Sequence, residues 1–319
     1  MISLNLVISL LADRVFGEVP RYHPLVGFGR LANRVEQRAR QSMSSRGAGR
    51  EAPTEVPAAT QRWYGTVCWS VLVIPPSVFL WLLQGALDDT AAAVLGMVTL
   101  YFCVGWRSLH EHANAVAEPL ARGDLASARA QLARIVSRDT AHLDTESVAK
   151  ATVESVLENG SDAVLAPIFW FVVAGAPGVL CYRLANTLDA MWGYRSARFL
   201  HFGRTAARVD DALNWLPARF CALSYAAVGQ RRAALSCWRT QAALCDSPNA
   251  GPVMSSGAGA LGIVLGGVAS YEQVEQWRPA LGQGRQVQTG DIGRALSLLG
   301  RAIGVWLIVL FAGELLLWG

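Results

Sequence analysis

Long uncharged stretches alternate along the chain with segments dense in charge. Residues 63–87 and 90–106 contain no Asp, Glu, Lys or Arg, and an acidic pair, Asp88-Asp89, separates them. The first stretch is long enough to cross a bilayer as a helix, and the second is at the short limit. We therefore predict a transmembrane helical hairpin over residues 63–106, with Pro75-Pro76 as a kink or break in its first helix.

The distribution of arginines predicts how this hairpin is oriented in the membrane. Seven Arg lie within residues 30–62, and Arg107 follows the second apolar stretch. Because the cytoplasmic loops of membrane proteins are enriched in Lys and Arg, both ends of the hairpin are predicted to be cytoplasmic. Residues 41–62 are small, polar and proline-bearing, which is typical of a flexible loop.

A third apolar segment, residues 163–182, is interrupted by Pro167, Gly175 and Pro177-Gly178, and a basic stretch follows it. If this segment crossed the membrane fully, the basic stretch would lie outside, against the positive-inside bias. Broken helices are tolerated at membrane depth where they line a protein cavity. The pattern favours a re-entrant or half-buried segment. Such a segment would bring the acidic helix before it and the arginine-rich stretch after it to one face.

The remaining segments complete an all-α prediction. Residues 107–162 are charged and periodic, which predicts a cytoplasmic helical region in which Asp124 caps one helix. Residues 163–319 are predicted to form a membrane and substrate-site region. Within it, residues 247–267 are rich in small side chains, which indicates close helix packing or, alternatively, a backbone-rich loop around a polar ligand. Residues 1–319 are therefore predicted to be one polytopic helical membrane domain with broken or re-entrant helices.

Composition agrees with a membrane protein. The chain is 52% hydrophobic and 16% charged, with a mean hydropathy of +0.29, which is too apolar for an ordinary soluble protein. Its eleven Trp suit anchors at the membrane interface. The net charge of +4 is small, and no RNA- or DNA-binding signature is present, so no nucleic-acid partner is expected. The six Cys include no CxxC pair, which argues against a zinc site or a disulfide framework.

An acidic column stands where the third apolar segment begins. Glu154, Glu158 and Asp162 follow one another at intervals of four, so on an α-helix they lie on one face. One interpretation is a solvated helix face in which Lys150 is the internal partner. The other is a Mg²⁺ site, because Mg²⁺ prefers carboxylate oxygens and usually takes one or two of them together with substrate phosphates.

A second candidate is His23, which precedes Pro24 in a segment rich in Gly and Pro. Such a segment forms a shaped loop. The histidine is a candidate general base or phosphate contact, and more commonly such a residue makes local hydrogen bonds. No Walker A loop or kinase glycine loop is present, so an ATP site would need another arrangement.

Seven stretches occur in the order in which one known family carries them. They are GEVPRYHPLVGFGR, RSLHEHANAV, GDLASARAQLARIVSRDTAHLD, TVESVLENGSDAVLAPIFW, NTLDAMWGYR, FGRTAARVDDALNWLPAR and SPNAG. On these motifs the chain resembles the CobD/CbiB family, the adenosylcobinamide-phosphate synthases of cobalamin biosynthesis, over nearly its whole length. Each stretch alone is a weak signal, and seven in order are a strong one.

The resemblance implies an integral membrane enzyme that joins a propionate carboxylate of adenosylcobyric acid to the amine of (R)-1-amino-2-propanol or its O-phosphate. ATP and Mg²⁺ are expected to be required, and the adenosylcorrinoid is a substrate. A carboxylate is a poor electrophile, so activation as an acyl phosphate is expected, with catalysis by positioning and charge neutralisation. The expected location is the inner membrane of a bacterial cell, with the active site on the cytoplasmic side. The lipid bilayer and other corrinoid-pathway enzymes are the expected partners.

With this function in view, residues of the matching motifs become site candidates. Glu154, Glu158 and Asp162 are predicted to hold Mg²⁺, and Asp210 and Asp211 to orient the amine or act as base. Asp139 and His23 are further catalytic candidates. The predicted contacts to substrate or phosphate are Arg107, Arg138, Asn186, Tyr194, Arg195, Arg198, Arg208, Ser247 and Asn249.

The chain departs from the family pattern at two places. Ser137 stands where members usually have Gly, and residues 252–254 (Pro, Val, Met) follow SPNAG where many members have an aromatic residue, Pro and Glu. The missing carboxylate marks a sub-branch or an altered donor preference. Two other classes of protein stay open. A non-catalytic, AmpE-like membrane signalling relative is disfavoured because the motifs keep their charges, and a transporter is disfavoured because no inverted repeat is evident.

Overall fold

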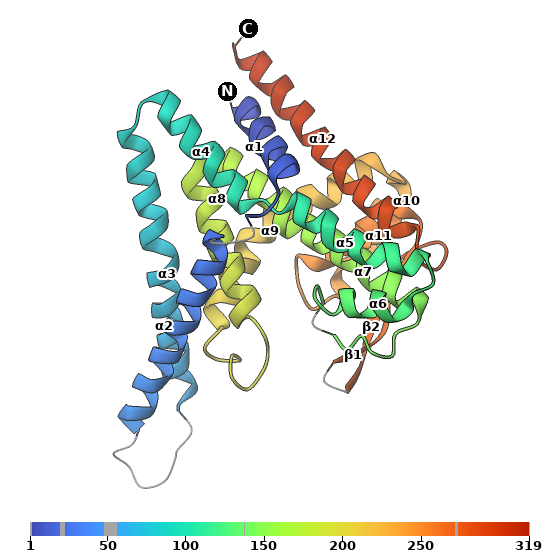
Figure 1. Ribbon diagram of the computed structural model, residues 1–319, viewed down its shortest axis with the longest axis horizontal. Helices are drawn as coiled ribbons and strands as arrows, with labels where there is room; N and C mark the ends of the chain where they lie inside the picture. The colour runs from blue at the N-terminus through green and yellow to red at the C-terminus, as the bar shows by residue number, and fades with distance from the viewer. Residues whose placement is uncertain (1, 20–22, 48–55, 137, 272–273, 319) are drawn as a thin grey trace. The chain divides into compact units, whose positions relative to one another are not determined.

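The computed structural model of the protein describes residues 2–19, 23–47, 56–136, 138–271 and 274–318. These residues fold almost entirely into α-helices, with one short strand hairpin (Figure 1). In this part of the chain, four helical stretches are long and apolar enough to cross a membrane: Ala58–Ala86, Asp89–Ala121, Thr145–Trp192 and Asp291–Leu317. The predicted class, a polytopic helical membrane protein, is confirmed.

The chain divides into two compact units. The first contains residues 1–7, 105–166 and 214–319, and the second contains residues 8–104 and 167–213. Each unit is described by itself. Compact units are not necessarily independent domains, so the single domain predicted from the sequence stays a prediction.

The second unit is built on α2 (Pro24–Gly47) and α3 (Ala58–Ala86), which lie side by side (Figure 1). The loop predicted over residues 41–62 is wrong at both ends, because the two helices extend into it. Met43 continues the buried stripe of α2 begun by Ala32 and Ala39, and this apolar periodicity prolongs the helix. Residues 48–55 of the predicted loop lie outside the described residues.

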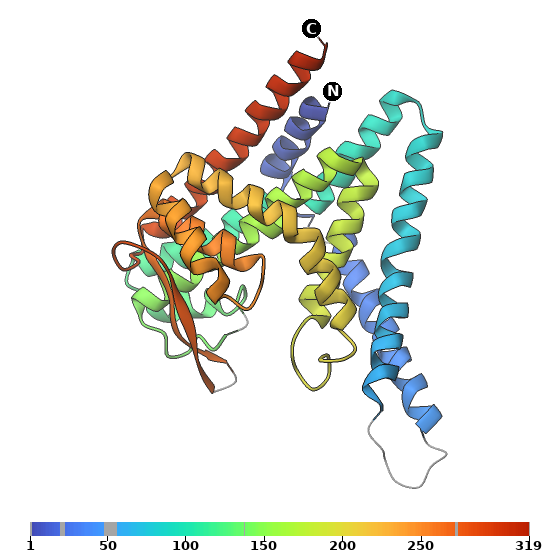
Figure 2. The same ribbon diagram turned by 180° about the vertical axis from the view of Figure 1, so that it is seen from behind.

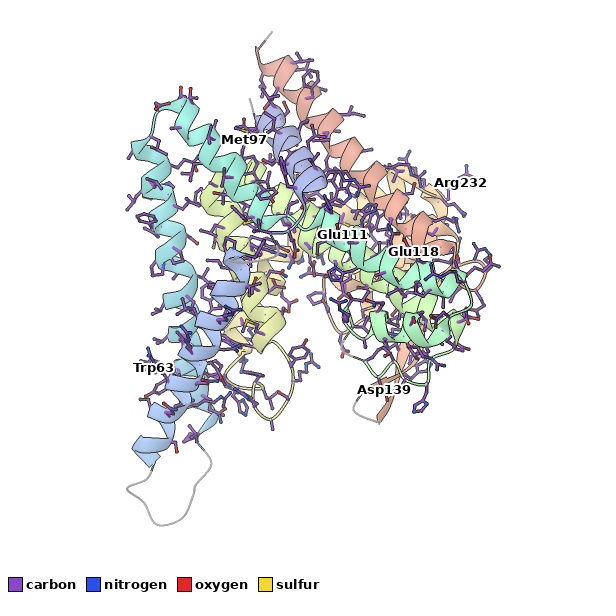
Figure 3. The ribbon with its side chains drawn as sticks, viewed as in Figure 1. Trp63, Met97, Glu111, Glu118, Asp139 and Arg232 are labelled. Carbon is purple, nitrogen blue, oxygen red and sulfur yellow. The ribbon has the colours of Figure 1, made fainter. Side chains whose placement is uncertain are left out.

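The predicted hairpin of apolar helices is present. Helix α3 runs without interruption through Pro75-Pro76, so these prolines do not end it. The side chain of Asp88 accepts hydrogen bonds from the backbone N–H groups of Thr90 and Ala91, each at 3.0 Å, and so caps α4 (Asp89–Cys103). The exposed face of α3 is apolar, and Trp63 stands near its beginning (Figure 3). Such a face suits lipid.

The third apolar segment is broken as predicted. It forms part of α8 (Ala166–Trp192), in which Ala174 and Gly175 leave the helical conformation. Gly175 has φ 62° and ψ −152°, a region that is essentially reserved for glycine. Pro177 lacks an N–H group and cannot continue the hydrogen-bond ladder across this point. The re-entrant topology stays a prediction. A loop over residues 193–203 leads to α9 (Arg204–Val228), which begins in the second unit and ends in the first.

The first unit holds the predicted cytoplasmic helices. Helices α5 (Trp106–Ala121) and α6 (Leu125–Leu132) meet at Asp124, whose side chain accepts from Ser127 N–H at 3.0 Å. The predicted N-cap is therefore confirmed. Helix α7 (Thr145–Gly160) follows, and its middle part, residues 151–157, is buried throughout.

The small residues after SPNAG form a buried helix, α11 (Ala250–Leu261). It packs on α10 (Arg231–Gln241), as Figure 2 shows from behind. A Cβ on Gly259 would lie 2.8 Å from the Ala233 carbonyl oxygen. The close-packing interpretation of this stretch is thus confirmed over α11. Helix η2 (Ala242–Leu244) joins α10 to the SPNAG turn.

A strand hairpin in the first unit was not predicted. Strands β1 (Val264–Tyr271) and β2 (Val274–Gly282) pair antiparallel, with a bulge between Leu265 and Gly267. Gly266 has φ 84°, and a Cβ there would lie 2.1 Å from the Pro279 carbonyl oxygen. The glycines interrupt the alternation that marks a strand in sequence.

Two helices at the ends of the chain complete the fold. Helix α1 (Ile2–Phe16) begins in the first unit, and α12 (Asp291–Trp318) ends the chain. The Ser3 N–H donates to Glu314 Oε1 at 3.0 Å. This bond gives a partner to the one carboxylate that interrupts the last apolar segment.

Candidate active site

Glu154 is the centre of a charge network in the first unit. It lies on α7 with only 3% of its side chain exposed. Its Oε2 accepts from Arg138, in the loop before α7, and from Arg278 Nη1 on β2 at 2.6 Å. Its Oε1 accepts from the backbone N–H of Gly266 at 3.0 Å. Three separate segments therefore converge on one carboxylate.

This arrangement changes the predicted role of two residues. Both oxygens of Glu154 are engaged by positive or donor groups, and Arg138 is paired with it. A carboxylate that neutralises two guanidinium groups offers no free oxygen to a cation. Glu154 therefore does not fit a Mg²⁺ ligand, and the network ties the strand hairpin to α7.

The acidic column is not continuous. Glu154 is buried, whereas Glu158 is exposed at the end of α7. A π-helical turn, η1 (Ser161–Leu165), follows and contains the half-buried Asp162. The wider π turn breaks the four-residue stacking expected of an α-helix. Among the described residues, no three His, Cys, Asp or Glu side chains are grouped to hold a metal. The Mg²⁺ role predicted for Glu158 and Asp162 stays a prediction.

A second group of acidic side chains lies in the second unit, on α8 and α9. Asn186 Nδ2 donates to Asp210 Oδ1 at 3.2 Å, and Asp210 is 8% exposed. The carboxylates of Asp210 and Asp211 act electrostatically on Asp189. Burial raises the pKa of Asp211, and the positive charge of Arg195 opposes that shift. The structure thus brings four of the predicted residues together.

Asp189 was missing from the predicted set. It lies three residues after Asn186 on α8, so the two share one helix face. The backbone of Gly193 packs against it, with Gly193 N–H donating to the Asp189 carbonyl at 2.6 Å. The motif NTLDAMWGYR contains this spacing, and the i, i+3 relation is the signal that would have found Asp189.

His23 has a local role at the start of α2. Its Nδ1 accepts from Leu25 N–H at 3.3 Å, and its carbonyl accepts from the N–H groups of Val26 and Gly27. Burial lowers the pKa of His23, the Glu18 carboxylate opposes this shift, and the Arg183 guanidinium adds to it. With Nδ1 occupied, the neutral ring carries its proton on Nε2. This geometry is that of a helix cap rather than a poised general base.

Arg198 is paired with a residue that the sequence analysis missed. Its Nη2 donates to Glu36 Oε2 at 2.7 Å, Arg40 bonds the same carboxylate, and Arg40 Nη2 donates to the Arg198 carbonyl at 2.5 Å. Burial raises the pKa of Glu36, but the two arginines outweigh it and hold the pKa below its ordinary value. Arg198 therefore fastens loop 193–203 to α2. A charged residue within the buried stripe of α2 was the available signal.

The SPNAG turn is held by its own side chains. Ser247 Oγ accepts from the N–H groups of Asn249 and Ala250 at 3.3 and 3.2 Å, and Asn249 Oδ1 accepts from Arg219 Nη1 at 2.8 Å. The three residues at 252–254 that depart from the family pattern are buried in α11. These contacts start α11, and the alternative of a ligand-cradling loop gains no support from them.

The other predicted site residues are half-buried or exposed. Arg107 Nε pairs with Glu111 at 2.6 Å, one turn along α5, and Asp139 accepts from Ala141 N–H at 2.9 Å. Glu111 and Asp139 are labelled in Figure 3. Tyr194, Arg195 and Arg208 are exposed in the second unit. Ser137 lies outside the described residues.

Comparison with known proteins assigns the family. The family model described as CobD/Cbib protein matches residues 6–299. The chain belongs to the CobD/CbiB family. The matched range includes the acidic residues on α8 and α9 and the Glu154 network. Both therefore lie in the part of the chain that the CobD/CbiB family shares.

Several curated CobD/CbiB relatives are named cobalamin biosynthesis protein CobD. The chain is 53% identical to the one from Stutzerimonas stutzeri, covering 98% of each chain. It is 50% identical to that of Chromobacterium violaceum, covering 99% of this chain and 97% of the relative. It is 37% identical to that of Mycobacterium tuberculosis, covering 93% and 90%. No solved structure matches. This CobD/CbiB chain is thus a protein of cobalamin biosynthesis.

Proposed function

We propose that this chain is an ATP- and Mg²⁺-dependent amide ligase that joins adenosylcobyric acid to (R)-1-amino-2-propanol or its O-phosphate. The observation that carries the proposal is the acidic group of the second unit, in which Asn186 bonds Asp210 and Asp211 follows. An amine substrate arrives as a cation and must lose a proton before it attacks. One carboxylate of a neighbouring pair can bind the cation, and the other can accept its proton.

The chemistry divides into two displacements. A carboxylate oxygen of the corrinoid attacks the γ-phosphorus of ATP, the bond to ADP breaks, and an acyl phosphate forms. The amine nitrogen then attacks the acyl carbon, inorganic phosphate leaves, and the amide forms. Asp211 is the proposed acceptor of the amine proton, since its raised pKa makes it a stronger base than an ordinary Asp.

Positive side chains are needed along this route because phosphate charge must be neutralised. Arg195 and Arg208 are exposed in the second unit and are the proposed phosphate contacts. Arg138 and Arg198 are paired with buried carboxylates and are not retained in this role. Bound Mg²⁺ would neutralise phosphate oxygens, and Glu158 and Asp162 are the carboxylates proposed to hold it. The proposed setting is the inner membrane, with the site on the cytoplasmic side.

A reaction in detergent or nanodiscs tests the proposal. Purified protein is mixed with adenosylcobyric acid, Mg-ATP and either aminopropanol or its phosphate, and products are followed by mass spectrometry. We expect a new amide that depends on ATP with at least one amine. A folded preparation that forms no amide with either amine would favour a non-catalytic, AmpE-like relative. Corrinoid uptake without ligation would favour a transporter.

Asp211→Asn tests the proposed base. Because the amide side chain cannot accept the proton, kcat is expected to fall by about 10²–10⁴-fold, with the KM for ATP little changed. In the wild type, kcat is expected to fall as the pH drops through the pKa of Asp211, which lies above the ordinary value of about 3.9. Stopped assays across pH measure both effects. An Asp211→Asn variant with normal turnover and the same pH profile would remove Asp211 from this role.

A further inference from the structure

Arg183, on α8 in the second unit, is a half-buried cation with very few partners. Its Nε is buried without a hydrogen bond. The bond recorded for its Nη1 is to Asn186 Oδ1, at a long 3.4 Å. Among the described residues, no Asp or Glu forms an ion pair with it. A guanidinium carries five N–H donors, and among the described residues only the Nη1 group of Arg183 has a side-chain partner.

Such a residue is unfavourable in an apolar segment unless something compensates its charge. Burying a charge without a partner carries a large desolvation penalty. The buried Glu36 of the same unit is compensated by two arginines. Ionisable side chains within membrane segments commonly face a substrate path. The missing counter-charge of Arg183 therefore points to a ligand.

The neighbours of Arg183 define the kind of ligand. Asn186 accepts from Arg183 through its carbonyl oxygen and donates to Asp210 through its amide nitrogen. One amide thus links a guanidinium to a carboxylate, and Asp211 follows Asp210 directly on α9. His23 also lies within electrostatic reach of Arg183, and burial lowers the pKa of its imidazole.

This bipolar arrangement matches a small molecule that carries an anion and an ammonium group close together. The planar guanidinium fork pairs with phosphate through two parallel hydrogen bonds. Of the proposed amine donors, aminopropanol phosphate carries its nitrogen and its phosphate oxygen on adjacent carbons. Unphosphorylated aminopropanol lacks the anion.

We propose that Arg183 binds the phosphate of the amine donor while its ammonium group faces Asp210 and Asp211, so that Arg183 selects the phosphorylated donor. This inference rests on the proposed ligase function. ATP also carries phosphate, and the experiment must separate the two sources.

Arg183→Gln and Arg183→Lys test the inference kinetically. We expect Arg183→Gln to raise the KM for aminopropanol phosphate about tenfold or more, the scale of one lost charge-assisted contact. The KM values for aminopropanol and ATP should change less than about twofold, and Arg183→Lys should lie between the wild type and Arg183→Gln. The matched control is Arg232→Gln, an exposed arginine on α10 (Figure 3). A rise confined to the KM for ATP, or an equal loss with both amines, would overturn the assignment.

A binding measurement keeps the inference apart from the proposed function. Without ATP or corrinoid, aminopropanol phosphate should raise the melting temperature of the wild type and of Arg232→Gln in detergent, and not that of Arg183→Gln. Aminopropanol alone should act equally on all three. If the wild type makes no amide but this Arg183-dependent stabilisation is seen, the ligase proposal fails and the phosphate site stands. If ligation occurs but aminopropanol phosphate stabilises Arg183→Gln as much as the wild type, the role proposed for Arg183 is wrong and the ligase proposal stands.

Discussion

At the scale of single residues, two kinds of charged side chain in the interior are treated differently. Glu154 and Glu36 each sit between two arginines. Arg183 has an amide as its near neighbour. A carboxylate with two guanidinium partners holds distant segments together. A guanidinium without a carboxylate is available to a ligand.

Glu154→Gln should destabilise the protein. The change leaves Arg138 and Arg278 without their counter-charge in a buried setting, which costs about 3–5 kcal/mol in comparable pairs. Chemical denaturation in detergent measures it. Glu118→Gln, at an exposed position of α5 in the same unit, is the control and should change stability by less than about 0.5 kcal/mol. Equal effects of the two changes would show that the Glu154 network contributes nothing special.

Glu36 should make the stability of the folded protein depend on pH in the acidic range. Its pKa is lowered in the folded protein, so its contribution is full above the unfolded value of about 4.3 and is lost as the pH falls through the folded pKa. The melting temperature of Glu36→Gln should therefore lie below that of the wild type at neutral pH, and the difference should shrink below about pH 4. Glu118→Gln, at an exposed position of α5 (Figure 3), should show no such trend. A constant difference at every pH would contradict this account.

At the scale of elements, α8 is the helix whose interruption matters most. Its break at Ala174–Gly175 separates the apolar half from the half that carries Arg183, Asn186 and Asp189. The break therefore lets the half of α8 that carries these polar side chains take a different direction from the apolar half.

Gly175→Ala should weaken this element. A Cβ would have to adopt φ 62° and would lie 3.3 Å from Gln84 Nε2, so a loss of about 1–3 kcal/mol is expected. Gly304→Ala in α12 is the matched control, because a Cβ there meets nothing within 4 Å and Ala favours a helix. Thermal melts in detergent compare the two. If Gly175→Ala melts no lower than Gly304→Ala, the break does not depend on glycine.

At the scale of the whole molecule, the four apolar stretches and the arginine distribution make a prediction about sidedness. The turn at Asp88-Asp89 should lie on the outer side of the inner membrane, away from the cytoplasm. Helix α5 should lie on the cytoplasmic side.

Single cysteines placed in a cysteine-free variant test this topology. Asp89→Cys should react with a membrane-impermeant maleimide in intact cells, whereas Glu118→Cys should react only after the cells are permeabilised. The six native Cys must first be replaced, and four of them are buried. The reverse labelling pattern would invert the predicted orientation.

Local signals in the sequence determined the helical hairpin, the cap at Asp124, the broken third segment and the family motifs. Each of these depends on neighbours within a few positions, where apolar periodicity, capping side chains, Gly and Pro act directly on the backbone. The acidic residues of α9 were also found in this way.

Tertiary structure alone decided which charges meet. Glu154 is joined to Arg278, and Glu36 to Arg198, across more than a hundred positions of the chain. No local pattern encodes such pairing, because it depends on how helices pack and not on how they form. The strand hairpin and the unsatisfied Arg183 became visible for the same reason. A buried charge acquires its role from the partners that folding brings to it or withholds from it.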